Sequence, residues 1–332
     1  MAVQPEVGHQ TDGPRLLRGV DILLTYRCTS ECRMCTYFGG PALTQPPLGR
    51  RAAIAAIKSV AYHPLEWVLL FGGEPCLEMD LMLAVARGIR PLVRATLIVF
   101  TNAYWAEDEM AAIEVLKPLR DSGVDCLNLS LDDYHTPFVP AGRVLNAAKV
   151  ALSLGLEATV DGRLPASPAE TKAAEHTLSL LDWIQRETGV ATTSGPIRPL
   201  GRASDLPDAL PDRLDSCVLP TYLGEGPSNP TGVEIHPGGE VCLCAGICLG
   251  NIHERPLNEI YYEYRSDRHP VLSALYRSGP RALLDQAISL GYLPSDVASA
   301  PMSRCRACYT ARKALLTEFK SELRPVHCYG VS

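Results

Sequence analysis

The sequence predicts an α/β fold in which an open barrel of parallel β-strands is followed by a smaller C-terminal domain. From about residue 18 to residue 200, short apolar runs alternate with amphipathic segments, which is the pattern of repeated βα units around a parallel sheet. Five or six such units are fewer than the eight of a closed TIM barrel, which favours a partial, TIM-like (βα)6 barrel. The alternation stops after Pro199, where the second part of the chain begins.

The expected strands and helices follow one another regularly within the barrel. Apolar runs place the strands at 19–25, 67–71, 96–101, 126–131, 157–160 and, more weakly, near 197. Amphipathic segments place the helices at 50–60, 79–90, 107–121, 141–154 and 170–187. Active sites of such folds lie at the carboxyl ends of the strands, so we expect the chemistry there.

Four regions are expected along the chain. Residues 1–17 form an N-terminal extension, 18–200 the barrel, 201–231 a proline-rich irregular connector, and 232–332 the C-terminal domain. In that last domain, apolar runs at 232–236 and 240–243 flank Pro-Gly-Gly and predict a β-hairpin. Amphipathic segments predict helices after it, at 257–265, 269–290 and 310–322.

Composition narrows the class of protein. The net charge of −6 comes without a basic stripe, which argues against nucleic acid as a partner. The first residues lack the basic start and apolar run of a secretory signal, and no stretch reaches the roughly 20 apolar residues that cross a bilayer. We therefore expect a cytoplasmic protein that does not bind membranes. In a reducing compartment, its twelve cysteines indicate metal binding or redox chemistry more than disulfides.

Three cysteines lie together on the loop that follows the first expected strand. Cys28, Cys32 and Cys35 form a CxxxCxxC motif at the expected mouth of the barrel. Thiolates hold iron–sulfur clusters, and three of them leave one iron of a four-iron cluster open. A structural zinc site is the alternative, but tetrahedral zinc needs a fourth ligand, and the first histidine further along is His63.

The motif resembles the signature of the radical S-adenosylmethionine (SAM) superfamily. The resemblance extends to Met34, which corresponds to the apolar residue that packs near adenine, and to Gly72, Gly73 and Glu74 of a Gly-Gly-Glu-Pro motif. It implies that the three cysteines hold a [4Fe-4S] cluster that binds and cleaves SAM. It also implies that the glycine backbone and the Glu74 carboxylate receive the SAM amino group. Both motifs together make the zinc alternative weaker.

Polar residues at later strand ends resemble further parts of the SAM site. Thr101 and Asn102 end the third strand, Ser130 ends the fourth, and Arg163 follows the fifth. The resemblance implies that they surround the ribose and methionyl groups of SAM, with Arg163 on its carboxylate, which suits a guanidinium. Strand-end capping or turn chemistry remains an alternative for each. The segment 199–203 resembles the family's sixth-strand motif near adenine.

A second set of cysteines lies in the C-terminal domain. Cys217, Cys244, Cys305 and Cys308, with Gly239 five positions before Cys244, resemble the twitch domain, a shortened SPASM domain. The resemblance implies that these four cysteines fully ligate one auxiliary [4Fe-4S] cluster. A structural zinc ribbon with the same ligands is the alternative, because spacing does not distinguish the two metals.

Three further residues are candidates for catalysis. Cys248 follows Cys244 on a stretch flanked by Ala-Gly and Leu-Gly, where we expect an exposed loop and a thiol able to return a hydrogen atom to a substrate radical. Packing or alternate ligation is the other interpretation, as for most spare cysteines. Asp132 and His135 end the fourth strand, where they could bind an amine or take a proton. A helix-capping loop is the alternative for that pair.

The resemblance implies an enzyme that forms a 5′-deoxyadenosyl radical and abstracts hydrogen from an unactivated C–H bond. Our main expectation is epimerisation of a carbinol carbon in an aminoglycoside or aminocyclitol, with a flavodoxin or ferredoxin as electron donor. Oxidation of the same type of carbon through the auxiliary cluster is one alternative. Modification of a ribosomally made peptide is another, which the short stretch before Cys28 disfavours mildly. A non-catalytic zinc or iron–sulfur protein is the last.

Overall fold

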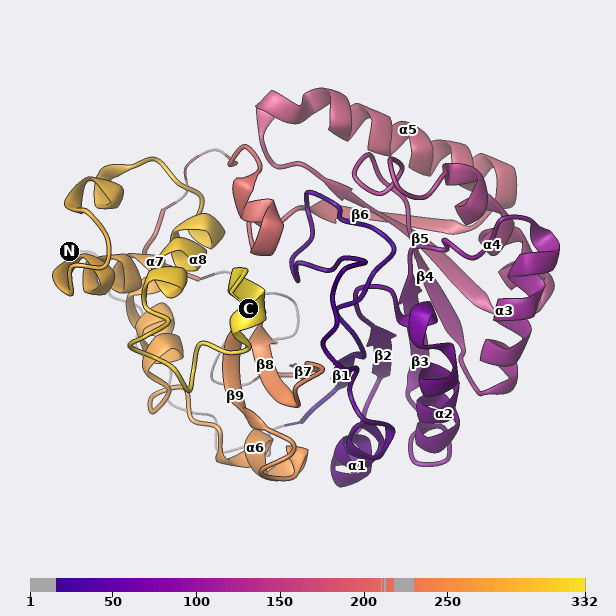
Figure 1. The fold of residues 1–332 in the computed structure, drawn as a ribbon, viewed down its shortest axis with the longest axis horizontal. Helices are drawn as coiled ribbons and strands as arrows, with labels where there is room; N and C mark the ends of the chain where they lie inside the picture. Colours follow the sequence, from indigo (N-terminus) through magenta and orange to yellow (C-terminus); the bar gives the residue numbers. More distant parts are fainter. Residues whose placement is uncertain (1–15, 210, 212, 218–229, 332) are drawn as a thin grey trace, which may run out of the picture.

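The parallel sheet expected from the sequence is present. The computed structural model describes residues 16–209, 211, 213–217 and 230–331. Its strands form one open sheet in the order β6-β5-β4-β3-β2-β1-β7-β8-β9. The six parallel strands of the barrel are β1 (Gly19–Leu23), β2 (Trp67–Phe71), β3 (Thr96–Thr101), β4 (Cys126–Ser130), β5 (Glu157–Leu164) and β6 (Ala191–Pro196). The sheet curves around the loop that follows β1 (Figure 1).

Five helices follow the barrel strands and cover the outer face of the sheet (Figure 1). They are α1 (Arg50–Val60), α2 (Met79–Ile89), α3 (Glu109–Asp121), α4 (Ala141–Ser153) and α5 (Thr171–Thr188). Successive side chains along each strand point to opposite faces of the sheet. Ile22 and Leu70 pack into the large core under the helices, whereas Leu23, Phe71 and Phe100 pack on the inner face. This second, inner face is where polar side chains gather.

The sixth strand lies just before the position expected for it. The apolar Ile197 suggested a strand near residue 197, but β6 is Ala191–Pro196 and pairs with residues 159–164 of β5. Most of its side chains are exposed or half-buried. Strand β6 lies at the edge of the sheet and pairs with one strand only. An edge strand is less enclosed than a central strand, so its sequence does not need the apolar run that identified the other strands.

The C-terminal hairpin continues the barrel sheet. Strand β7 (Gly232–Ile235) pairs in parallel with β1, and β8 (Glu240–Cys244) and β9 (Ile247–Asn251) follow as antiparallel partners. Strand β9 was not expected. The turn between β8 and β9 contains Gly246 with φ +80°, a conformation that glycine adopts without steric cost.

Three helices pack beyond the hairpin (Figure 1). They are α6 (Leu257–Glu263), α7 (Pro270–Ser289) and α8 (Arg304–Ala314). The last begins at residue 304 and not at 310, because Ser303 caps its start by accepting a hydrogen bond from the Arg306 backbone. Residues 210, 212 and 218–229 of the expected connector, and 1–15 of the expected extension, lie outside the described residues. Among the helices of the described ranges, none combines the length and apolarity needed to cross a membrane.

Candidate active site

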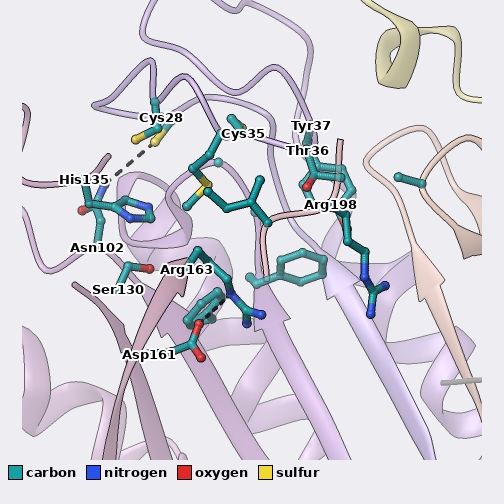
Figure 2. Close-up of a pocket in the computed structure, with 18 of the residues that line it drawn as sticks. Cys28, Cys35, Thr36, Tyr37, Asn102, Ser130, His135, Asp161, Arg163 and Arg198 are labelled. Carbon is teal, nitrogen blue, oxygen red and sulfur yellow. Dashed lines mark hydrogen bonds and ion pairs between the residues drawn. The ribbon is translucent and has the colours of Figure 1, made fainter. Parts of the chain in front are cut away.

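Most of the side chains singled out from the sequence line one cavity of about 410 Å³ at the carboxyl ends of the barrel strands. Those that line it are Cys28, Cys32, Met34, Cys35, Gly72, Gly73, Thr101, Asn102, Ser130, Asp132, His135, Arg163 and Cys244. Figure 2 shows Cys28 and Cys35 on the loop above the strand ends, with Ser130 and Arg163 projecting from the strands below. Glu74, Cys217, Cys248, Cys305 and Cys308 do not line it.

Two of the three N-terminal sulfurs accept hydrogen bonds from the backbone of their own loop. The Ser30 amide donates to the Cys28 sulfur and the Gly39 amide donates to the Cys35 sulfur, each at 3.4 Å. Burial is the main reason why the pKa of Cys28 is raised to about 12, and it also raises the pKa of Cys32. A buried thiolate therefore needs a metal partner, and amide donors aimed at sulfur are the environment of iron–sulfur ligands. The loop fits a cluster held by three cysteines.

The paired glycines after β2 pack against the backbone that carries these cysteines. The Gly73 amide donates to the Thr25 carbonyl at 2.6 Å. A side chain at Gly72 would meet the Thr25 carbonyl at 2.5 Å, and one at Gly73 would meet the Arg27 carbonyl at 2.3 Å. Only glycine permits such contact. The pair thus fixes the start of the cysteine loop as well as exposing backbone to the cavity.

Glu74 lies behind the residues that line the cavity. Its side chain is fully buried, and its carboxylate accepts hydrogen bonds from Thr101 Oγ1 at 2.8 Å, from the Asn102 amide at 2.8 Å and from the Cys76 amide at 3.0 Å. That the carboxylate receives the SAM amino group stays a prediction, and in this structure three protein donors already occupy it. Its role in the structure is to fix Thr101 and Asn102, which do line the cavity.

Asp132 and His135 form a buried pair at the cavity wall. Asp132 Oδ1 accepts from His135 Nδ1 at 2.9 Å and from the Tyr134 and His135 amides at 3.0 Å, and Oδ2 accepts from the Arg163 amide at 3.1 Å. Burial opposes ionisation of Asp132, but His135 and these donors outweigh it and lower its pKa. Burial likewise opposes the charged form of His135, but Asp132 outweighs it and raises its pKa. The capping interpretation is confirmed, since Asp132 accepts from the amides of the turn and orients the His135 imidazole. Amine binding or proton transfer by the pair stays a prediction.

The pair gives a pH-dependent contribution to stability. The His135 pKa is raised, so its share is complete below its unfolded value of about 6.5 and is lost as the pH rises through the folded pKa. The Asp132 pKa is lowered, so its share is present above about 3.9 and is lost as the pH falls through the folded pKa. The loss of unfolding free energy in Asp132→Asn is therefore expected to be largest between about pH 4 and 6.5. Urea unfolding of the metal-free chain at several pH values measures it. A loss that is independent of pH across this range would contradict the ion pair.

Arg163 and Asn102 both line the cavity, and each also has a protein partner. Arg163 Nε lies 2.8 Å from Asp161 Oδ2, and Asn102 Nδ2 lies 3.9 Å from the Cys28 sulfur (Figure 2). Met34 packs against an apolar cluster that includes Tyr134 and Ile197. The Arg163 side chain is 42% exposed, so its guanidinium is still available to a ligand carboxylate.

Sequence reasoning missed several charged residues of the same cavity. Asp161, Arg198 and Glu234 all line it. Asp161 could have been found, because it lies two residues before Arg163 and therefore on the same face of β5. Glu234 could not, because it reaches the cavity only through the parallel pairing of β7 with β1. Its carboxylate accepts from Tyr37 at 2.6 Å and pairs with His236 at 2.6 Å.

The structure brings the four C-terminal cysteines together. Each of Cys217, Cys305 and Cys308 is within electrostatic reach of the Cys244 thiol. Burial raises the pKa of all three, to about 11 for Cys305. Cys244 lines the main cavity, while Cys217 and Cys305 line an adjoining cavity of about 280 Å³. Within the described part of the chain, no three His, Cys, Asp or Glu side chains are arranged so that they could hold one metal ion. The two thiol sets border cavities that share Pro196, Ile197 and Arg198 in their walls.

The structure does not place Cys248 as expected. It lies in β9 and not on a loop, and it is buried, with its thiol donating to the Gly250 carbonyl at 3.2 Å. It is the cross-strand partner of Cys242. The expectation of an exposed thiol was wrong because the Ala-Gly and Leu-Gly flanks belong to a β-hairpin that the sequence did not reveal. Nothing in its position supports hydrogen donation into the cavity.

Comparison with known proteins places the chain among proteins of the same architecture. No protein-family model matches it. A curated relative from Bacillus subtilis (strain 168), "Putative peptide biosynthesis protein YydG", is 22% identical over 149 residues, which are 43% of this chain and 46% of that protein. The chain thus matches less than half the length of this relative.

Solved structures share the fold over most of the chain. Streptococcus suis SuiB bound to S-adenosylmethionine matches with a TM-score of 0.53 and 15% identity, over 95% of this chain and 77% of SuiB. SuiB bound to the precursor peptide SuiA gives 0.54 and 13%, over 89% and 76%. The protein anSMEcpe bound to AdoMet and the Kp18Cys peptide gives 0.52 and 12%, over 91% and 96%. At these identities the likeness shows a common fold.

Proposed function

We propose, on the premise that this chain has the fold of radical SAM enzymes, that it is a radical SAM enzyme that modifies a peptide. The observation that carries the first part is the loop of Cys28, Cys32 and Cys35 at the mouth of a cavity of about 410 Å³. Two buried thiols and one partly buried thiol, with amide donors aimed at two of the three sulfurs, suit a [4Fe-4S] cluster with one iron free for SAM. Bound there, such a cluster supplies the electron that splits SAM into methionine and a 5′-deoxyadenosyl radical.

The chain's own residues then bind and orient the two substrates. The backbone of Gly72 and Gly73 and the side chains of Asn102 and Ser130 surround the space next to the cysteine loop. Arg163 offers the guanidinium for a carboxylate, and Asp132 holds His135 in one orientation. These groups are fixed by hydrogen bonds to the protein before any ligand binds, which lowers the entropy lost on binding.

The comparisons favour a peptide over our main expectation of an aminoglycoside. Two of the three solved structures, SuiB with SuiA and anSMEcpe with the Kp18Cys peptide, contain a bound peptide. The curated relative is named for peptide biosynthesis. The cavity wall supports the proposal, because it carries both signs of charge, with Arg163 and Arg198 beside Asp161 and Glu234. An amphoteric wall suits a peptide backbone with mixed side chains better than a polycationic sugar. Nothing in the comparisons favours epimerisation.

We propose that Cys217, Cys244, Cys305 and Cys308 hold a second, fully ligated cluster where the two cavities adjoin. The fit rests on four buried or partly buried thiols within electrostatic reach of one another and on a wall of Pro196, Ile197 and Arg198 that is common to both cavities. A centre in this place supplies an electron acceptor or donor near the substrate.

The test uses the full chain, purified and reconstituted without oxygen and reduced with dithionite. We expect about eight irons per chain and 5′-deoxyadenosine from added SAM. Synthetic peptides from short reading frames next to the gene are offered in parallel with a set of aminoglycosides. A mass change in a peptide, with 5′-deoxyadenosine formed in step, supports the proposal. Turnover of an aminoglycoside without any peptide change would refute the substrate class, and zinc without iron would refute both clusters.

A further inference from the structure

Arg312 is a buried cation with no carboxylate partner among the described residues. It lies in α8, its side chain is fully buried, and its guanidinium sits near two aromatic rings, 5.8 Å from the centre of Tyr309 and 5.5 Å from that of Tyr329. Its Nη1 donates to the Ala245 carbonyl at 2.8 Å and to the Tyr329 hydroxyl at 3.1 Å. Its Nε and Nη2 are buried without a hydrogen-bond partner.

Such an arrangement is unfavourable unless an anion lies at the two unused donors. Arginine stays charged in proteins, and a buried charge without a counter-ion is strongly destabilising. Aromatic faces attract the guanidinium but accept none of its in-plane N–H bonds. The Nε and Nη2 groups therefore indicate a negatively charged acceptor in the space beside α8.

The four C-terminal thiols provide that acceptor. Cys308 precedes Arg312 by one helical turn and lies on the same face of α8, and Ala245, which Arg312 contacts, directly follows Cys244. The Arg312 guanidinium interacts electrostatically with the Cys308 and Cys244 thiols. The cation is thus directed at the ligand set and not at solvent.

We propose that Arg312 is the buried counter-ion of the auxiliary iron–sulfur centre, where it makes the centre easier to reduce and makes the stability of this region depend on loading. The inference rests on the proposed function, because it takes Cys217, Cys244, Cys305 and Cys308 as cluster ligands. Reduction adds one negative charge to the centre, and a fixed positive charge nearby in a region of low dielectric constant stabilises the reduced form more than the oxidised form. Without the centre, the same cation has no counter-ion.

The experiment uses the full chain with Cys28, Cys32 and Cys35 replaced by alanine, so that only the auxiliary centre is loaded. In this background Arg312 is kept, changed to lysine, which retains the charge, or changed to methionine, which removes it. Lys313→Met is the matched control, since it removes the same charge one residue further along α8 from an exposed side chain. Each protein is assayed for iron, for its midpoint potential by titration followed by electron paramagnetic resonance, and for Tm with and without the cluster.

We expect Arg312→Met to lower the equilibrium constant for one-electron reduction at least tenfold, which makes the midpoint potential at least 59 mV more negative. Arg312→Lys should change it less, and Lys313→Met should leave it as it was. The rise in Tm on loading should fall by at least half in Arg312→Met, because the metal-free form no longer buries an unpaired charge. If Arg312→Met loses the iron and Arg312→Lys retains it, the counter-ion role of the positive charge is also supported.

If all four proteins have the same midpoint potential and the same rise in Tm on loading, the role of Arg312 is overturned, while the cluster assignment stands. If the background binds zinc and no iron, the iron–sulfur assignment of the auxiliary set and the redox part of the inference both fail. A Tm rise on zinc loading that is the same with and without Arg312 would then also overturn the counter-ion role. The two failures are therefore distinguishable.

Discussion

Replacing Cys28, Cys32 and Cys35 together by alanine is expected to remove about four of about eight irons and to reduce 5′-deoxyadenosine formation to background. The reason is that the three thiols are the only cysteines on the loop after β1, and they border the same cavity as the residues proposed to hold SAM. The auxiliary set lies in another part of the chain and should keep its iron. Iron analysis and quantification of 5′-deoxyadenosine by mass spectrometry measure both effects.

Cys126→Ala is the matched control for this replacement. Cys126 lies in β4 at the end remote from the cavity, and its thiol donates to the Leu127 carbonyl at 3.6 Å. It should keep the full iron content and the wild-type rate. If the triple variant still forms 5′-deoxyadenosine at more than about one-thousandth of the wild-type rate, the radical SAM proposal fails, because that corresponds to only about 4 kcal/mol of lost stabilisation of the transition state.

The fold was predictable where local pattern decides it. Strands β2 and β3 occupy the residues expected for them, since each is a short apolar run between helices. Strand β9 was missed because Ile247–Asn251 ends in Gly250 and Asn251, residue types that are more frequent in turns than in strands. The pairing of β7 with β1 joins residues more than 200 positions apart, and no local pattern of the sequence reports it.

The candidate site divides in the same way. The thiols and the paired glycines were found because close spacing along the chain brings them together on one or two loops. Glu234 was missed because its place in the cavity depends on the β7–β1 pairing. Cys248 was misplaced for a related reason, since its neighbours in sequence suggested a loop while its cross-strand contact with Cys242 fixes it in a sheet. A motif reveals which residues are close in sequence, but it does not show which way each side chain points.

A second large effect is expected from replacing the buried Glu74. Glu74→Ala removes the acceptor of three buried donors, which are Thr101 Oγ1 and the amides of Asn102 and Cys76. Each unsatisfied buried donor destabilises by about 1–3 kcal/mol, so we expect a loss of unfolding free energy of at least about 3 kcal/mol. Urea unfolding of the metal-free chain measures it. Because Asn102 loses its anchor next to the Cys28 sulfur, SAM binding to the reconstituted protein should also weaken by about tenfold or more.

Glu78→Ala separates this effect from the simple loss of a glutamate. Glu78 lies four residues further on and forms an ion pair with Arg27 at 3.1 Å, with its own side chain 23% exposed and that of Arg27 42% exposed. A partly exposed ion pair contributes about 1 kcal/mol or less, so this variant should stay close to the wild type in both measurements. If Glu74→Ala is as stable as Glu78→Ala, the three hydrogen bonds do not hold the loop. If Glu74→Ala is much less stable but binds SAM as the wild type does, Glu74 supports the fold without positioning Asn102 for the cofactor.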